Sequence, residues 1–208
     1  MKEVMIATRN KGKVAEFEQF FANKGVHVRS LFDAEEIPDI VEDGATFEAN
    51  AIKKAVTVQE ALGITVISDD SGLEVDALDG APGIYSARYA GLEEKGDEAN
   101  NAKLLQELKG IEGKARSARF VCVLAAAFPS GVVKTVRGTV EGHIADSLSG
   151  TEGFGYDPLF ILEGEERTMA HLTRAEKNEK SHRADALKQM DALWGEWLLE
   201  HKEEEKRQ

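Results

Sequence analysis

The stretch ARSARFVCVLAAAFPSGVVKTVRGTVEGHIA, residues 115–145, decides the expected fold. It holds two long runs in which Val, Ala and Phe predominate, and β-branched and aromatic residues favour strands. The runs are separated by Pro129, Ser130 and Gly131, a composition that is typical of a tight turn. The segment therefore predicts two long strands joined in a hairpin.

The first part of the chain alternates between strand and helix patterns. Apolar residues at helical spacing mark each predicted helix, and Gly25 and Gly63 provide stop signals. Thr46 is a suitable N-cap for the second helix. We expect a strand at residues 3–7, a tight polar loop at residues 8–13, a helix that ends at Gly25, a strand at residues 26–32, an acidic loop at residues 33–44 and a helix at residues 46–62.

The remaining elements complete an α/β pattern. We expect strands at residues 64–68, 72–78 and 156–162, an irregular Gly-rich segment at residues 79–96, a helix at residues 97–110 and a last helix from about Ser181. Early strand–helix alternation followed by a hairpin predicts a mixed sheet flanked by helices. We expect a single domain over residues 1–200 and a solvated, frayed tail over residues 201–208.

Composition and charge exclude several classes of protein. The 208 residues are 42% hydrophobic and 31% charged, which is ordinary for a globular chain. The net charge of −12 argues against a protein that coats nucleic acid. No apolar run is long enough to cross a bilayer, and the N-terminus lacks a signal-peptide pattern. Cys122 is the only cysteine, lies in an apolar run and fits a reducing cytoplasm.

Two adjacent carboxylates, Asp69 and Asp70, follow the apolar run at residues 64–67. Ligands of open α/β sheets bind beyond the carboxyl ends of strands, so these acids could hold Mg²⁺ or activate water. Strand side chains alternate between faces, so the two acids should point in different directions and have different roles. The alternative is that both are turn residues, since Asp-Ser-Gly also favours turns.

Two further motifs carry charges that suit phosphate or metal. The loop TRNKGK, residues 8–13, precedes a predicted helix, and backbone amides at a helix N-terminus attract phosphate. A capped turn with surface lysines explains this motif about equally well. Glu42 precedes the second helix, which carries Lys53 and Lys54, and it could be another metal ligand or an ordinary loop acid.

Two motifs in the second half could contact a base or phosphates. Phe154 and Tyr156 lie among glycines and could offer a stacking surface, although a loop aromatic more often anchors its loop to the core. A basic cluster is expected where the last helix begins, and cations there oppose the helix dipole, which indicates function. The alternative is a solvated basic turn paired with nearby glutamates. The cluster comprises Lys177, Lys180, His182 and Arg183.

Five stretches, in their order and spacing, resemble the inosine triphosphate pyrophosphatase-like family over nearly the whole chain. They are TRNKGK (8–13), TFEANAIKKA (46–55), SDDSGLEVDALDGAPGIYSARYAG (68–91), GFGYDPLF (153–160) and EKNEKSHRADAL (176–187). The resemblance implies Mg²⁺-dependent hydrolysis of dITP, ITP and XTP to the monophosphate and pyrophosphate, which cleanses the nucleotide pool. It also implies a homodimer and an elongated mixed β-sheet flanked by helices, with an active-site cleft between two lobes.

The resemblance also assigns residues to roles. Asp70 would be the catalytic proton acceptor, and Glu42 and Asp70 would lie close to Mg²⁺. Substrate binding would involve Thr8, Arg9, Asn10, Lys11, Gly12, Lys13, Lys54, Ser71, Phe154, Gly155, Tyr156, Asp157, Lys177, His182 and Arg183.

Two other hypotheses stay open on the residues alone. A strand that runs into two acids is also compatible with a phosphatase that uses an aspartyl nucleophile. A nucleotide-binding sensor without turnover could have the same pocket.

Overall fold

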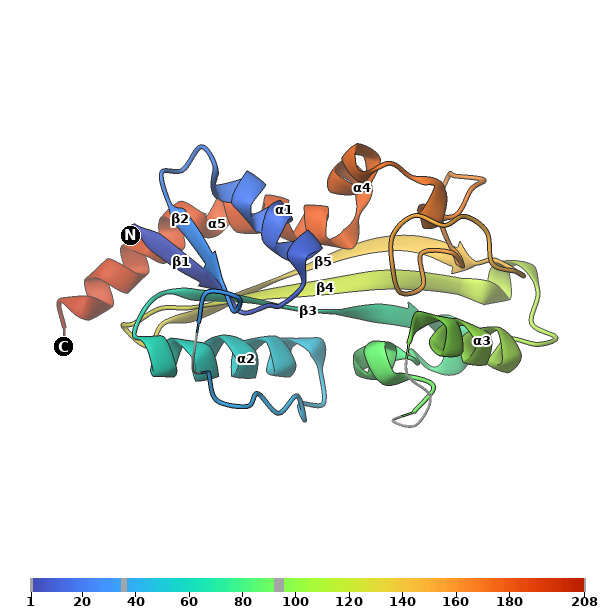
Figure 1. Ribbon diagram of the computed structural model, residues 1–208, viewed down its shortest axis with the longest axis horizontal. Helices are drawn as coiled ribbons and strands as arrows, with labels where there is room; N and C mark the ends of the chain where they lie inside the picture. Colours follow the sequence, from blue (N-terminus) through green and yellow to red (C-terminus); the bar gives the residue numbers. More distant parts are fainter. Residues whose placement is uncertain (1, 35–36, 92–95, 208) are drawn as a thin grey trace. The chain divides into compact units, whose positions relative to one another are not determined.

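The computed structural model describes residues 2–34, 37–91 and 96–207 and has a mixed α/β fold (Figure 1). Its strands form a six-stranded sheet in the order β2-β1-β3-β4-β5-β6. β1 pairs in parallel with β2 and β3, whereas β5 and β6 are antiparallel, so the predicted mixed sheet is confirmed. The strands are β1 (Glu3–Ile6), β2 (His27–Ser30), β3 (Val66–Val75), β4 (Ser117–Ala127), β5 (Val133–Ile144) and β6 (Phe160–Leu162).

The helices begin and end largely where local signals place them. Thr46 caps the second helix by accepting a hydrogen bond from the amide of Ala49, and Gly63 ends it with a φ of 67°. None of the helices in the described ranges is both long and apolar enough to cross a membrane. The helices are α1 (Lys11–Phe21), α2 (Phe47–Leu62), α3 (Asp97–Glu107), α4 (Arg174–Lys180) and α5 (His182–Glu205).

The predicted hairpin is confirmed as β4 and β5. The amide of Phe128 donates to the carbonyl of Val132 at 2.9 Å, which closes the turn between the two strands. Burial alternates over the first residues of β4 and then becomes continuous from Phe120 to its end. One face of β4 is therefore partly open in its first part, whereas both faces are covered in the second.

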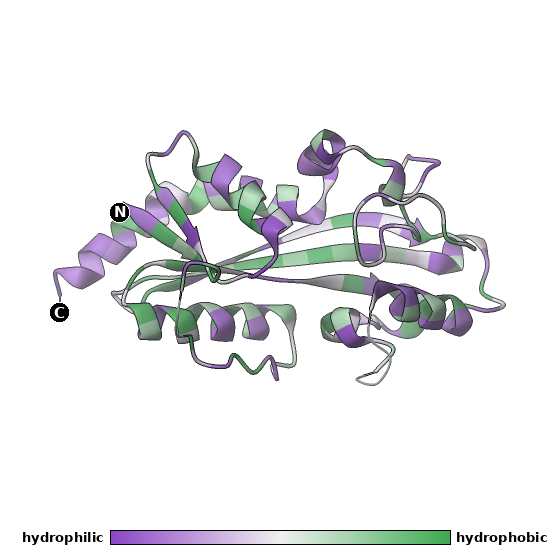
Figure 2. Ribbon diagram, viewed as in Figure 1, coloured by the Kyte–Doolittle hydropathy of each residue, from purple (hydrophilic) through white to green (hydrophobic). Residues whose placement is uncertain are grey.

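The chain divides into two compact units that share the long strands. Unit 1 comprises Met1–Asp70, Val123–Arg137 and Ala186–Gln208, and unit 2 comprises Ser71–Cys122 and Gly138–Asp185. Each unit has buried apolar residues from several elements, and hydrophobic residues follow the long strands in Figure 2. The expected cleft stays a prediction.

Four elements differ from the sequence-based expectation. Residues 64–68 and 72–78 do not form separate strands, because β3 continues through the two acids, Ser71 and Gly72. The strand expected at residues 156–162 is limited to β6, and the residues just before it form turns. A short helix, α4, precedes α5 and was not predicted.

The acidic loop and the Gly-rich segment are described except at residues 35–36 and 92–95, which lie outside the described ranges.

The charged end of the chain is helical through Glu205 rather than frayed from residue 201. His201 stacks on Phe128 with ring centroids 5.1 Å apart, and its Nδ1 lies 2.8 Å from the hydroxyl of Ser130. These contacts with the β4–β5 turn hold the last turns of α5. Residue 208 lies outside the described ranges.

We predict that Trp194→Ala lowers the free energy of unfolding by about 3–5 kcal/mol, because it removes a large buried aromatic side chain. Trp194 is 6% exposed and packs against Phe21 and Phe128, with ring centroids 5.4 and 6.0 Å away. Denaturant titration would measure the change. Leu199→Ala on the same helix is the control, because Leu199 is 62% exposed and should change stability by less than about 0.5 kcal/mol. A loss below about 1 kcal/mol for Trp194→Ala would contradict the packing role.

Candidate active site

The two neighbouring acids lie inside β3 and contact different helices of unit 1. The side chain of Asp69 forms an ion pair with Lys13 of α1. The side chain of Asp70 faces Lys54 of α2, with 3.6 Å between Oδ1 and Nζ. α1 and α2 lie on opposite sides of the sheet strands of this unit (Figure 1). The expectation that the two acids point in different directions is confirmed, although they lie within a strand and not at its end.

Lys54 of α2 lies close to two acidic side chains and one backbone oxygen of this unit. Its Nζ donates to the backbone oxygen of Asp69 at 3.0 Å and lies 3.2 Å from Oε1 of Glu42. Together with the contact to Asp70, one ammonium group therefore has three oxygen neighbours. We call Lys13, Glu42, Lys54, Asp69 and Asp70 the β3 carboxylate cluster.

Asp70 is the least compensated member of this cluster. The residue is 8% exposed, and its Oδ2 accepts no hydrogen bond from any residue in the described ranges. Burial raises the pKa of Asp70 to about 6, and the carboxylates of Glu42 and Asp69 add to the rise, while Lys54 and the polar side chain of Asn50 oppose it. A carboxyl group with this pKa is ionised at neutral pH and can accept a proton.

The expected phosphate loop forms a tight cap on α1. Asn10 is the N-cap, and its Oδ1 accepts hydrogen bonds from the amides of Gly12 at 2.9 Å and Lys13 at 3.2 Å. Thr8 Oγ1 accepts from the amide of Asn10 at 3.2 Å. Residues 11–13 therefore belong to the first helical turn and not to the loop as expected, since Asn10 already caps the helix. Arg9 and Lys11 are exposed at the same end of α1.

One residue of unit 1 was missed by the sequence analysis. Asn50 is 1% exposed, and its Oδ1 accepts a hydrogen bond from the amide of Gly44 at 2.8 Å. A polar residue next to the apolar positions Phe47 and Ala51 of α2 was the available signal. A buried amide in a helix needs partners, which here come from outside the helix.

A second set of predicted residues gathers in unit 2 around Asp157. Its Oδ2 lies 2.7 Å from Nζ of Lys177 and accepts from the amide of Phe154 at 3.3 Å. Burial raises the pKa of Asp157, while Lys177 and Arg183 act in the opposite direction. Gly153 has a φ of 97°, and a Cβ there would lie 2.0 Å from Asp157 Oδ2, so only glycine fits.

We call residues 153–157 the Gly-rich loop. Some of its residues are exposed, and others are anchored to the rest of unit 2. Phe154 is 57% exposed, whereas Tyr156 is 4% exposed and donates its hydroxyl hydrogen to the carbonyl of Ser86 at 2.9 Å. The amide of Gly155 donates to Oδ2 of Asp97 at 2.6 Å, and its carbonyl accepts from Nδ2 of Asn101 at 2.8 Å. Tyr156 and α3 therefore fix the loop, and Phe154 is the aromatic ring that stays accessible.

The basic cluster lies only in part at a helix N-terminus, where cations oppose the helix dipole as expected. Lys177 and Lys180 lie in the last turn of α4, where cations are favourable, because Thr173 and Glu176 start a separate helix with a capping box. His182 and Arg183 begin α5. The cations of the cluster are thus divided between two helices.

His182 and Arg183 have different surroundings within unit 2. The His182 ring stacks on Phe120 at 5.0 Å between centroids, and Arg183 is 4% exposed. Ser71, in the part of β3 that belongs to unit 2, is half-buried.

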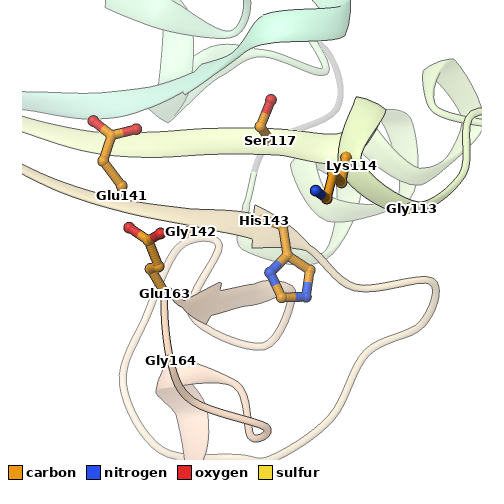
Figure 3. Close-up of a pocket in the computed structure, with 8 residues that line it drawn as sticks. All are labelled: Gly113, Lys114, Ser117, Glu141, Gly142, His143, Glu163 and Gly164. Atoms are coloured by element: carbon orange, nitrogen blue, oxygen red, sulfur yellow. The ribbon is translucent and has the colours of Figure 1, made fainter.

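A surface pocket of about 720 Å³ lies elsewhere in unit 2 (Figure 3). The predicted site residues do not line it. Glu141, one of its acids, is already bound by Arg119 at 3.0 Å. We therefore place the candidate active site at the β3 carboxylate cluster. The pocket is lined by Gly113, Lys114, Ser117, Glu141, Gly142, His143, Glu163 and Gly164.

The donor set of the β3 carboxylate cluster fits a hard divalent cation. Within the described ranges, groups of three or more His, Cys, Asp or Glu side chains that could hold a metal are absent. The carboxylates of Glu42 and Asp70 nevertheless both approach the same atom, Nζ of Lys54. Oδ2 of Asp70 has no hydrogen-bond donor among the described residues. Mg²⁺ is usually bound by one or two carboxylates together with substrate phosphates, so two acids suffice.

Comparison with known proteins gives matches over nearly the whole chain. Residues 4–193 match the model of the Ham1 family. A dITP/XTP pyrophosphatase of Bacillus licheniformis is 55% identical over 193 residues, which are 93% of this chain and 98% of that protein. The solved Ham1 protein of Staphylococcus aureus is 46% identical with a TM-score of 0.85, over 94% of this chain and 100% of that one. A HAM1 protein of Coxiella burnetii is 37% identical with a TM-score of 0.87, over the same shares.

We predict that Asp70→Asn stabilises the metal-free protein at pH 8. The folded-state pKa of about 6 lies above the ordinary value of 3.8, so the cost of the ionised carboxylate to folding grows from about pH 4 and is complete above about pH 6. At 1.36 kcal/mol per unit, the amide should raise the free energy of unfolding by up to about 3 kcal/mol at pH 8 and by roughly half as much at pH 5.

Urea titrations with a chelator present at both pH values would measure this gain. Asp69→Asn is the contrast, because it removes the partner of Lys13 and should destabilise the protein. A gain for Asp70→Asn that is absent at pH 8, or that is larger at pH 5, would contradict the assigned burial cost.

Proposed function

The chain belongs to the Ham1 family, and we propose that it is a nucleoside triphosphate pyrophosphatase that acts on non-standard purine nucleotides. Family membership confirms the resemblance carried by the five sequence motifs. The proposed reaction is the Mg²⁺-dependent hydrolysis of dITP, ITP and XTP to the nucleoside monophosphate and pyrophosphate. This activity would keep these bases out of DNA and RNA.

The observation that carries the proposal is the state of Asp70. It is buried, its Oδ2 accepts no hydrogen bond within the described ranges, and its pKa is raised to about 6. A base with these properties is ionised at neutral pH and can take a proton from water. The water oxygen would attack the α-phosphorus, the bond from that phosphorus to the bridging oxygen would break, and pyrophosphate would leave.

The β3 carboxylate cluster would also hold the metal. Glu42 and Asp70 are the residues that would bind Mg²⁺, which when bound neutralises negative charge on the phosphate oxygens. Lys54 already lies within 3.6 Å of both carboxylates and would supply a second cation to the same region. Lys13 is held by Asp69 and would face the triphosphate from the start of α1.

Local positive charge is needed because the protein as a whole is acidic. The net charge of −12 would repel a triphosphate from most of the surface. The residues of the α1 cap, Thr8 to Lys13, together with Lys54, would bind the phosphates. The leaving pyrophosphate carries most of the developing charge in a dissociative transition state, so these cations matter more than the base.

The loop around Phe154 would recognise the base. Phe154 is exposed and could stack on any purine, so it would add affinity without discrimination. Hypoxanthine and xanthine carry an acceptor at O6 where adenine carries an amino group. Donors from His182, Arg183 or a loop amide would pair with O6 and reject adenine, because the donors would then lack a partner. Tyr156, Asp157 and Lys177 would hold this loop in place.

Two properties are expected from the family resemblance. We propose that the protein is a homodimer and that it acts in the cytoplasm. Its only cysteine, Cys122, is buried, which suits a reducing compartment.

We predict that the purified protein with Mg²⁺ releases pyrophosphate from dITP, ITP and XTP much faster than from dGTP or dATP. A nucleotide panel with separation of pyrophosphate from orthophosphate would measure this. In ¹⁸O-labelled water, a single turnover of dITP should place the label in the monophosphate. Unlabelled monophosphate in the first turnover would support an aspartyl nucleophile instead, and binding without any product would support a sensor.

We predict that Asp70→Asn lowers kcat for dITP by about 10²–10⁴-fold while the substrate still binds, because the amide cannot accept a proton. Asp69→Asn should lower kcat less, since Asp69 positions Lys13 and is not expected to contact water. Steady-state kinetics on both variants, with calorimetric dITP binding, would measure the difference. Equal losses would mean that the two acids act as a unit.

A further inference from the structure

Asn50 occupies a position that its residue type does not favour. It lies near the start of α2, where Thr46 is the cap, and it is 1% exposed. Asparagine is a weak helix former, and a buried amide side chain is costly unless its donors and acceptor find partners. Ala51 next to it and Phe47 one turn earlier are apolar and buried. An apolar residue at position 50 would suit the helix better, so the amide has another purpose.

One partner of Asn50 is the loop that carries Glu42. Its Oδ1 accepts a hydrogen bond from the amide of Gly44 at 2.8 Å, two residues after Glu42. A Cβ on Gly44 would lie 2.6 Å from that oxygen and 2.9 Å from the Cβ of Ala49, so the loop backbone presses against α2. The side chain of Asn50 therefore fixes where this loop passes the helix.

The helix of Asn50 also faces Asp70 on β3. Lys54 lies one helical turn after Asn50 on α2 and lies within 3.6 Å of both Glu42 and Asp70. Ser68, two residues before Asp70, ties β3 to the same helix by donating to the carbonyl of Ala51 at 2.5 Å. The helix that Asn50 belongs to thus contacts both the loop with Glu42 and the strand with Asp70.

We propose that Asn50 is a positioning residue that fixes the loop with Glu42 against α2 and thereby sets the distance between Glu42 and Asp70 for a divalent cation. An amide is suited to this task, because its oxygen can accept a hydrogen bond from the loop amide. The role rests on the proposed function, since it assumes that these carboxylates bind Mg²⁺. Residues that orient metal ligands without contacting the metal typically change affinity or activity by about 10–100-fold when replaced.

The test is Asn50→Leu, which keeps the approximate shape of the side chain and removes its hydrogen bond to the loop. We expect Mg²⁺ to bind about 10–100-fold more weakly in calorimetry without nucleotide. The matched control is Asn100→Leu in α3. Asn100 is also buried at 4% exposure, and its Oδ1 also accepts a loop amide, that of Ala90, at 2.8 Å. Both exchanges remove a buried hydrogen bond, but only the first should weaken Mg²⁺ binding.

A second variant guards against misfolding of Asn50→Leu. Gly44→Ala leaves Asn50 intact and displaces the loop from it, so it should weaken Mg²⁺ binding in the same direction. Excess Mg²⁺ should restore part of kcat for dITP in either variant, which a purely structural defect would not show. Wild-type Mg²⁺ affinity in folded Asn50→Leu would overturn the positioning role while leaving the proposed function intact. Conversely, weakened Mg²⁺ binding without any pyrophosphate release by the wild type would leave the role intact and sink the proposed function.

Discussion

The burial of two adjacent carboxylates inside β3 is the constraint on which the rest of unit 1 depends. Removing a carboxylate from water costs several kcal/mol unless a partner compensates it. Asp69 receives Lys13 from α1, whereas Asp70 receives Lys54 at longer range. The helices on the two sides of the strand therefore have to present a cation at a fixed place. Lys13 does so from the first turn of α1, and Lys54 from about two turns into α2.

The charges of Asp69 and Asp70 are compensated to different extents. Asp69 has a direct ion pair, but Asp70 keeps an oxygen without a donor in the described ranges and has a raised pKa. Such local destabilisation is typical of functional sites, where a group is kept reactive at a cost to stability. The loop with Glu42 shares this arrangement, because Lys54 contacts both the loop and the strand and Asn50 binds the loop.

Unit 2 uses a buried carboxylate for a different purpose. Asp157 binds Lys177 and the amide of Phe154, so its carboxylate holds the Gly-rich loop in place. Gly153 permits this close approach, and α3 holds Gly155 from the other side through Asp97 and Asn101. The result is a rigid loop in which Phe154 alone among its aromatics stays exposed. A fixed aromatic ring suits stacking, because little side-chain entropy remains to be lost on binding.

The sequence by itself determined the features that depend on near neighbours: the helix from Thr46 to Gly63, the hairpin of β4 and β5, and the different directions of Asp69 and Asp70. Caps, turns and side-chain alternation act over a few residues, so they are readable locally. Only the tertiary structure decided that β3 continues through the turn-forming residues Ser71 and Gly72, since pairing with neighbouring strands overrides local propensity. It also decided the partners of Asn50 and Lys177, because Gly44 and Asp157 reach them through folding and not through any sequence period.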